Sequence, residues 1–168
     1  MPEKLKKAAF YDSLSKLPNR RVFHKQLQAA LNNKKVAVMM VDGWKFKQIN
    51  DTYGHVTGDA VIVEMGKRIR ANVRKQDTVA RIGGDEIAIL LPNIESQQIA
   101  EEIAKRIIQS FTSPFFFNGT CIHMGISIGM TLYPDHTLDM NMLIKYADKA
   151  LYEAKEVGKN QYKIYRTT

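Results

Sequence analysis

Two carboxylates follow two glycines near the middle of the chain. The segment from Gly83 to Glu86 lies between short apolar runs at 78–80 and 87–91, which are typical of buried strands. Glycine adopts the positive φ of a tight turn without steric cost, and its bare backbone lets a phosphate or a base come close. The sequence therefore predicts a β-hairpin with Asp85 and Glu86 at its tip. A solvated hairpin with ordinary surface acids is the alternative interpretation.

A third carboxylate, Asp42, follows a run of Val, Ala and Met at 35–41. This run does not alternate with polar residues, as expected of a central strand that is covered on both faces. Ligands of open α/β sheets gather beyond the carboxyl ends of the strands, so Asp42 is placed to meet one. Gly43 would allow a close backbone approach. The alternative is a plain turn that ends a strand.

Polar residues crowd the segment after this strand. A short helix is predicted at 46–51, then a turn at 50–55, and Asp59 opens a long helix over 60–73. Asp59 can simply stabilise the helix N-terminus. Alternatively, Asn50 and Asp59 act together, because an amide and a carboxylate can donate to and accept from the Watson–Crick edge of guanine.

The composition limits the class of protein. A chain of 168 residues with 45% hydrophobic residues predicts one domain, and it has neither a bilayer-spanning run nor a secretory signal. These features predict a cytoplasmic location with no membrane contact by this segment. A single cysteine, Cys121, fits a reducing compartment and is interpreted as a small core residue. The net charge of +8 favours an anionic partner: nucleic acid, an acidic membrane or a phosphorylated small molecule.

The predicted elements alternate between helices and strands. Two βαβ units in succession indicate an α+β fold with a ferredoxin-like or nucleotidyl cyclase-like βαββαβ core. Its mainly antiparallel central sheet carries the core helices on one face, is flanked by further helices and has an extra β-hairpin. The predicted elements are helices 2–10 and 19–31, strand 35–41, helices 46–51 and 60–73, strands 78–80 and 87–91, helix 94–111, a hairpin of 115–117 with 120–133, helix 139–157 and edge strand 161–165. We expect residues 1–10 to be a linker helix from an upstream segment and 11–168 to be the domain.

Five collinear blocks of sequence together resemble one family. They are 12–20, 46–59, 83–87, 127–129 and 147–155. With the signature Gly-Gly-Asp-Glu-Ile in the third block, the chain resembles the GGDEF family, the diguanylate cyclase domains of bacterial signalling proteins. The resemblance implies that two GTP molecules condense to cyclic di-GMP and pyrophosphate. It also implies that each domain holds one GTP, that the active form is a homodimer, and that an upstream sensor or receiver domain regulates it.

The resemblance assigns roles to named residues. It implies a Mg²⁺ site, or Mn²⁺ in its place, formed by Asp42, the carbonyl of Gly43, Asp85 and Glu86. It implies catalytic roles for Asp85, as the base for the 3′-hydroxyl, and for Glu86 and Lys47. The residues that it implies for substrate binding are Asn50, His55 and Asp59 for guanine, and Lys155 and Lys159 for the phosphates.

A second site follows from the same resemblance. Arg74 and Asp77 form an Arg-x-x-Asp motif at the offset of the family's inhibitory site, where cyclic di-GMP binds, and Arg106 matches an assisting arginine. The resemblance thus implies product feedback inhibition. The alternative is an exposed helix-end ion pair that stabilises the fold by about 0–1 kcal/mol.

Three residues depart from the family pattern. Trp44 replaces a second acid, Ile87 replaces phenylalanine at the fifth signature position, and Lys159 replaces an arginine. Trp44 supports a rival function, a catalytically weak GGDEF domain that senses GTP or cyclic di-GMP. A nucleic-acid-binding module is the other rival, and the sequence argues against it because the aromatic strand motifs of RNA-recognition domains are missing.

Overall fold

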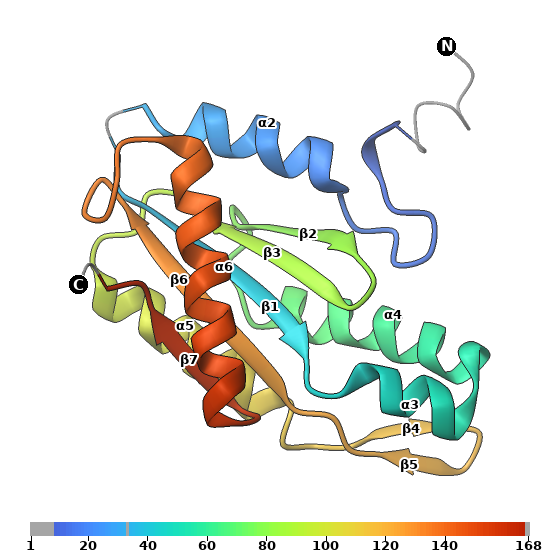
Figure 1. Ribbon diagram of the computed structural model, residues 1–168. Coiled ribbons are helices and arrows are strands. Elements are labelled where there is room, and N and C mark those ends of the chain that lie inside the picture. Colours follow the sequence, from blue (N-terminus) through green and yellow to red (C-terminus); the bar gives the residue numbers. More distant parts are fainter. Residues whose placement is uncertain (1–8, 33, 167–168) are drawn as a thin grey trace.

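The computed structural model describes residues 9–32 and 34–166 (Figure 1). A central sheet has the strand order β2-β3-β1-β6-β7, in which β1 is antiparallel to both of its neighbours and β7 is parallel to β6. The strands are β1 (Val36–Gly43), β2 (Thr78–Gly83), β3 (Glu86–Leu91), β6 (Ile126–Tyr133) and β7 (Gln161–Ile164). The mainly antiparallel sheet that the sequence predicts is confirmed.

Helices cover both faces of the sheet. On β1, Ala37, Met39 and Val41 pack in one apolar cluster with α4 (His55–Ala71) and α5 (Gln97–Ser110). The alternate residues, such as Val38 and Met40, pack in a second cluster with α2 (Arg20–Ala30) and α6 (Met140–Val157). The core β1-α4-β2-β3-α5-β6 therefore has its two helices on one face, as predicted, and α2 and α6 close the other. Burial on both faces explains the unalternated apolar run.

One predicted strand is two strands. Residues 120–133 divide into β5 (Thr120–Ile122), which pairs with β4 (Phe115–Phe117), and β6, which joins the central sheet. β6 leaves the hairpin because it pairs with β1 over eight residues, a far longer ladder than the small hairpin offers. Cys121 lies on this peripheral hairpin and is exposed, so its interpretation as a core residue was wrong.

Two predicted boundaries also move. The structure extends β1 through Asp42 and Gly43, so both lie inside the strand. α4 begins at His55, directly after α3 (Phe46–Tyr53), so Asp59 lies within the helix and does not open it. Gly54, with φ +90°, separates the two helices and supplies the bend that sequence reasoning assigned to a longer turn.

Helix α6 rests directly on the sheet at Gly129 of β6. A β-carbon built there would lie 2.2 Å from the carbonyl oxygen of Ala147 and 2.2 Å from the amide nitrogen of Leu151. No side chain fits in that space, so glycine permits the close approach of helix and strand. Gly129 therefore fixes the position of the helix that carries Asp148 and Lys155.

The N-terminal part of the chain is anchored to the hairpin. Asp12 accepts hydrogen bonds from the Ser15 amide at 2.7 Å and from Arg81 Nη1 at 3.0 Å. Burial works to raise the pKa of Asp12, but these bonds outweigh it, and the pKa lies below its usual value. Most of the predicted helix 2–10 lies outside the described residues. Within 9–32 and 34–166, the helices are too short or too polar to cross a membrane.

Candidate functional site

The three sequence-predicted acids meet where the hairpin tip lies beside the end of β1. Gly83 pairs with Glu86, and Gly84 has φ +50°, which leaves Asp85 in the turn. Asp42 lies opposite Glu86 in the ladder between β1 and β3. The Gly43 amide donates a hydrogen bond of 3.1 Å to Asp85 Oδ2. Residues more than forty positions apart therefore form one acidic site.

Gly43 lets Asp85 lie against the backbone of β1. A β-carbon at this position would be 3.2 Å from Asp85 Oδ2 and 3.0 Å from Met124 Sδ. Both contacts are tighter than ordinary packing, so a side chain here would push the carboxylate away. The glycine thus has a packing reason as well as the predicted freedom for a ligand to approach.

The site holds more negative charge than its surroundings balance. Burial, followed by the hydrogen bond and the charge of Asp42, raises the pKa of Asp85 to about 7, against a lowering effect of Lys155. Burial, with the charges of Asp148 and Asp42, also raises the pKa of Glu86. Lys155 forms an ion pair with Asp42 Oδ2. These carboxylates would be stabilised by a bound cation.

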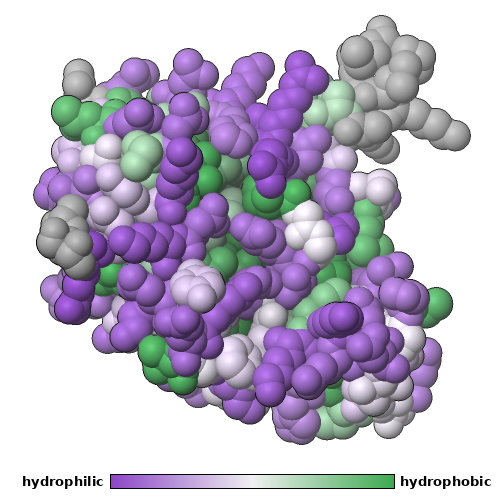
Figure 2. Space-filling model, viewed as in Figure 1, coloured by the Kyte–Doolittle hydropathy of each residue, from purple (hydrophilic) through white to green (hydrophobic). Residues whose placement is uncertain are grey.

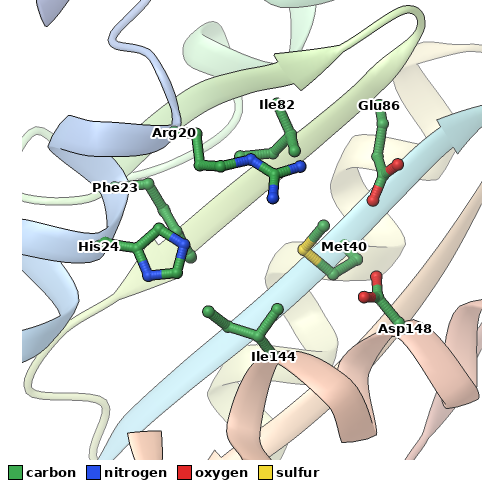
Figure 3. A pocket seen from close by; sticks show the side chains of 8 residues that line it. All are labelled: Arg20, Phe23, His24, Met40, Ile82, Glu86, Ile144 and Asp148. Carbon is green, nitrogen blue, oxygen red and sulfur yellow. The ribbon is translucent and has the colours of Figure 1, made fainter. Parts of the chain in front are cut away.

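Glu86 also faces a small pocket between α2 and α6. The pocket measures about 50 Å³, and Figure 3 shows Arg20, Glu86 and Asp148 around its polar part. Burial raises the pKa of Asp148, while Arg20 and Lys155 oppose that rise. Figure 2 shows this face dominated by hydrophilic side chains, with hydrophobic ones visible in recesses between the helices. Sequence reasoning gave Arg20 and Asp148 no role, although both belong to the matching blocks.

The predicted guanine contacts lie on α3 and α4. Gly58 is buried against the amide of Asn50, and a β-carbon there would lie 1.7 Å from Asn50 Oδ1. Asn50 therefore packs against α4 one residue before Asp59. Asp59 and His55 are exposed, so both are open to a ligand. Only glycine at position 58 leaves room for the Asn50 side chain next to Asp59.

The remaining predicted substrate contacts differ in their exposure to solvent. Lys47 and Lys159 are exposed, whereas Lys155 is partly buried beside Asp42. The Trp44 amide donates to the Gly125 carbonyl at 2.8 Å. The Nζ atom of Lys45 lies 5.5 Å from the centre of the Trp44 ring. The ring is half-buried and belongs to the loop directly after Gly43.

The Arg74–Asp77 pair lies at the other end of β2. Asp77 is only 4% exposed, and it accepts bonds from the Arg74 amide at 2.6 Å and from Arg74 Nη2 at 2.7 Å. Arg74 Nη2 also donates to the Pro92 carbonyl at 2.7 Å. The alternative interpretation as an exposed helix-end pair was therefore wrong, because the carboxylate is buried.

Two further arginines hold the same loop. Arg70 donates to the carbonyls of Asp77 and Arg74, each at 2.5 Å. Arg106 donates to the Asn72 carbonyl from Nε at 3.1 Å and from Nη2 at 2.9 Å. The structure thus brings Arg106 to Asn72, beside the loop of Arg74 and Asp77, and its role in binding cyclic di-GMP stays a prediction. Arg70 was missed, and its place in the last turn of α4 was the only signal for it.

The acidic site could hold a divalent metal through oxygen atoms. In the described part of the chain, no three His, Cys, Asp or Glu side chains form a ready-made metal cluster. Mg²⁺ needs fewer protein ligands, since it keeps waters and binds one or two carboxylates together with substrate phosphates. Asp42, Asp85 and the carbonyl of Gly43 fit that donor set, because the two carboxylates adjoin and the Gly43 backbone contacts Asp85.

Comparison with known proteins identifies the family. The family model described as "Diguanylate cyclase, GGDEF domain" matches residues 9–161. The chain belongs to the GGDEF family. Diguanylate cyclase TpbB of Pseudomonas aeruginosa is 39% identical to this GGDEF domain over 162 residues, which cover 93% of this chain and 37% of TpbB. The resemblance stated from the sequence blocks is confirmed.

Solved structures agree with this assignment. The GGDEF domain of TpbB superposes with a TM-score of 0.90 at 38% identity, covering 93% of this chain and 94% of that one. DgcB from Caulobacter crescentus, solved with c-di-GMP, has a TM-score of 0.85 at 26% identity, covering 96% of this chain and 88% of that one. The nucleotidyl cyclase-like fold is therefore shown.

Not all relatives of this GGDEF domain are named as cyclases. Cyclic di-GMP phosphodiesterase PdeR of Escherichia coli is 35% identical over 166 residues, covering 97% of this chain and 25% of PdeR. The chain spans between about a quarter and two fifths of the first curated relatives it matches. Membership of the family is thus clear, while the activity of this chain is a separate question.

Proposed function

We propose that this domain is a diguanylate cyclase that condenses two GTP molecules to cyclic di-GMP. The observation that carries the proposal is the acidic site, in which Asp42 and Asp85 adjoin and the pKa of Asp85 is raised to about 7. Phosphoryl transfer requires positioned substrates and neutralised oxygens. A site with excess carboxylate charge, exposed lysines nearby and an intact signature sequence supports that chemistry.

Asp42, Asp85 and the Gly43 carbonyl would hold Mg²⁺, or Mn²⁺ in its place, with Glu86 as a further contact. Such an ion supplies charge neutralisation at the phosphate oxygens. Asp85, at the hairpin tip, would also be the base that accepts the proton of the attacking 3′-hydroxyl. Lys47, Lys155 and Lys159 would bind the triphosphate and offset the charge on the leaving pyrophosphate.

Guanine recognition is assigned to the junction of α3 and α4. Asn50 packs against Gly58 beside Asp59, and both Asp59 and His55 are exposed. An amide and a carboxylate at this spacing suit the N1–H, exocyclic amine and carbonyl of guanine. The proposed base contacts therefore lie on helices, which follow the end of β1 that carries Asp42.

The reaction needs two copies of the domain. Each holds one GTP, so the ring closes only when two sites face each other across a two-fold axis. An upstream sensor or receiver domain would regulate activity by controlling that encounter. Feedback inhibition is assigned to cyclic di-GMP bound at Arg74, Asp77 and Arg106, which lie around one loop.

A sensor of GTP or cyclic di-GMP is the second candidate function. The half-buried Trp44 ring directly after Gly43 favours it, because a large side chain there reduces the space for a nucleotide. Both faces of the sheet are covered by helices, which argues against an RNA-binding sheet surface. The two candidates differ in turnover alone.

Incubation of the domain with GTP and Mg²⁺, followed by chromatography of the products, tests the proposal. Formation of cyclic di-GMP and pyrophosphate supports the cyclase. GTP binding by calorimetry without product supports the sensor. Trp44→Asp restores the usual acid and is the informative companion variant: activity that arises only in this variant identifies Trp44 as the cause of a weak wild-type enzyme.

A further inference from the structure

Lys155 of α6 lies among four carboxylates. Its ammonium group pairs with Asp42 Oδ2. Its charge also lowers the pKa of Asp85, Glu86 and Asp148. The Lys155 side chain is 41% exposed, whereas that of Asp42 is only 14% exposed. A cation that solvent can reach thus occupies a carboxylate that is mostly enclosed.

The pairing with Asp42 is sparse in comparison with a structural ion pair. Among the described residues, Lys155 is the only cationic side chain that pairs with the Asp42 carboxylate. Asp77, by contrast, accepts bonds from the amide, Nε and Nη2 of Arg74. Lysine offers a compact charge on a flexible four-carbon chain, which can change partners without movement of the backbone. The Lys155–Asp42 ion pair can therefore dissociate more easily than the Arg74–Asp77 pair.

We propose that Lys155 is a built-in counter-ion that occupies Asp42 until a metal ion and a triphosphate arrive together. A metal that binds Asp42 must displace the ammonium group, which then needs another anion. The phosphates of the nucleotide supply one, so binding of metal and nucleotide becomes mutually favourable. This inference rests on the proposed function, since it concerns the same site.

The reach of Lys155 is set by its side chain and not by the helix. Gly129 holds α6 in contact with β6, with no space for even a β-carbon between them. Rotation about the side-chain bonds is left as the way for the ammonium group to move from Asp42 to a phosphate. The exchange therefore requires no rearrangement of the fold.

Binding of Mn²⁺ without nucleotide, followed by electron paramagnetic resonance, tests the first half of the proposal. Lys155→Met should bind Mn²⁺ at least about tenfold more tightly than the wild type, because Asp42 is freed. Lys145→Met is the matched control, since Lys145 is exposed on the same helix. Lys145 lies about 15 Å from Lys155 along the helix axis, which is beyond the screening length of about 10 Å at 0.1 M salt. The Mn²⁺ affinity of Lys145→Met should therefore differ from that of the wild type by less than about twofold.

The second half is tested by repeating the titration with a GTP analogue that cannot be cleaved between the α- and β-phosphorus. The analogue should tighten Mn²⁺ binding to the wild type at least about tenfold and should do so far less in Lys155→Met. Equal metal affinity of wild type and Lys155→Met, or the same gain in both lysine variants, overturns the proposal. Lys155→Gln serves as a second variant if Lys155→Met melts at a lower temperature.

Neither titration measures turnover, so the outcome is separable from that of the proposed function. A domain that forms no cyclic di-GMP, but whose Lys155→Met variant binds Mn²⁺ more tightly, supports the counter-ion and refutes the cyclase. A domain that forms cyclic di-GMP, but whose Lys155→Met variant binds Mn²⁺ as tightly as the wild type, supports the cyclase and refutes the counter-ion.

Discussion

Two aspartates lie at opposite ends of strand β2 and have opposite surroundings. Asp77, before the strand, is 4% exposed and is bonded by the amide and the guanidinium of Arg74. Asp85, after the strand, accepts one bond from the Gly43 amide and adjoins another acid, Asp42. One end of the strand has all of its charge balanced by the protein, and the other end has not.

This difference in charge balance indicates different roles: Asp77 stabilises its loop, whereas Asp85 is suited to bind a ligand. A buried carboxylate with a complete set of donors rigidifies its loop, whereas acids crowded together without enough cations gain stability only when a ligand brings positive charge. If cyclic di-GMP binds at Arg74 as proposed, it would have to share donors that Asp77 already uses. Binding at Asp85 would instead relieve repulsion.

The largest expected effect is on turnover at the Asp85 end. Asp85→Ala should lower product formation by at least about a thousandfold, because the metal loses a ligand and the hydroxyl loses its base. Chromatography of the products measures this loss, and circular dichroism should show an unchanged fold. Glu95→Ala, at an exposed loop acid, is the control. Wild-type turnover by Asp85→Ala would sink the assignment.

Base selectivity extends the comparison to Asp59, another acid that is open to a ligand. GTP should be used over ATP by about a hundredfold or more in kcat/KM, because adenine has neither the N1–H nor the C2 amine from which Asp59 would accept hydrogen bonds. Steady-state assays with both nucleotides measure the ratio. Asp59→Ala should reduce it towards unity, and equal use of the two nucleotides by the wild type counts against the guanine pair.

Mutation of Arg74, at the other end of β2, should lower the stability of the fold. Arg74→Ala leaves Asp77 buried without its guanidinium, which should reduce the free energy of unfolding by about 3 kcal/mol. Chemical denaturation measures this, with the exposed Lys75→Ala as control. A change below about 1 kcal/mol would contradict this stabilising role of Arg74.

The same variant tests feedback inhibition. Calorimetry should detect cyclic di-GMP binding to the wild type and none to Arg74→Ala. Product should slow its own synthesis in the wild type, and the slowing should be absent in the variant at a similar initial rate. Absence of cyclic di-GMP binding to the wild type would refute the inhibitory site.

The smallest effect concerns pH. The pKa of Asp85 is raised from 3.8 to about 7, so its ionisation in the folded state destabilises the domain as pH rises through that range. Asp85→Asn, which carries no charge, should therefore melt about 1–4 °C above the wild type at pH 8 and at the same temperature below pH 4. Thermal scans without metal measure the difference, and a variant that is less stable at pH 8 contradicts the cause given for the shift.

Local patterns predicted the elements well, while features that depend on distant contacts escaped. The caps of α2 and α6, Asn19 and Asp139, are as their side-chain chemistry indicates. The departure of β6 from its hairpin was missed because its long pairing with β1 is invisible in local sequence. Exposure of Cys121 was missed for the same reason.

The candidate site shows the same limit. The family resemblance implied that Asp42 and Asp85 share one site, but not that Lys155 pairs with Asp42, since that pair joins residues more than a hundred positions apart. The burial of Asp77 depends on how the loop folds around Arg70 and Arg74. Residue types and local spacing therefore could not predict which distant side chains pair in the folded domain.

Gly129 limits how the proposed upstream domain could control this one. Because α6 touches the backbone of β6 there, the helix cannot slide or rotate on the sheet without losing contact across a core cluster. An incoming signal is thus poorly suited to remodelling the interior of the domain. Such a signal would act by moving whole domains together or apart, and different upstream domains could then regulate the same rigid unit.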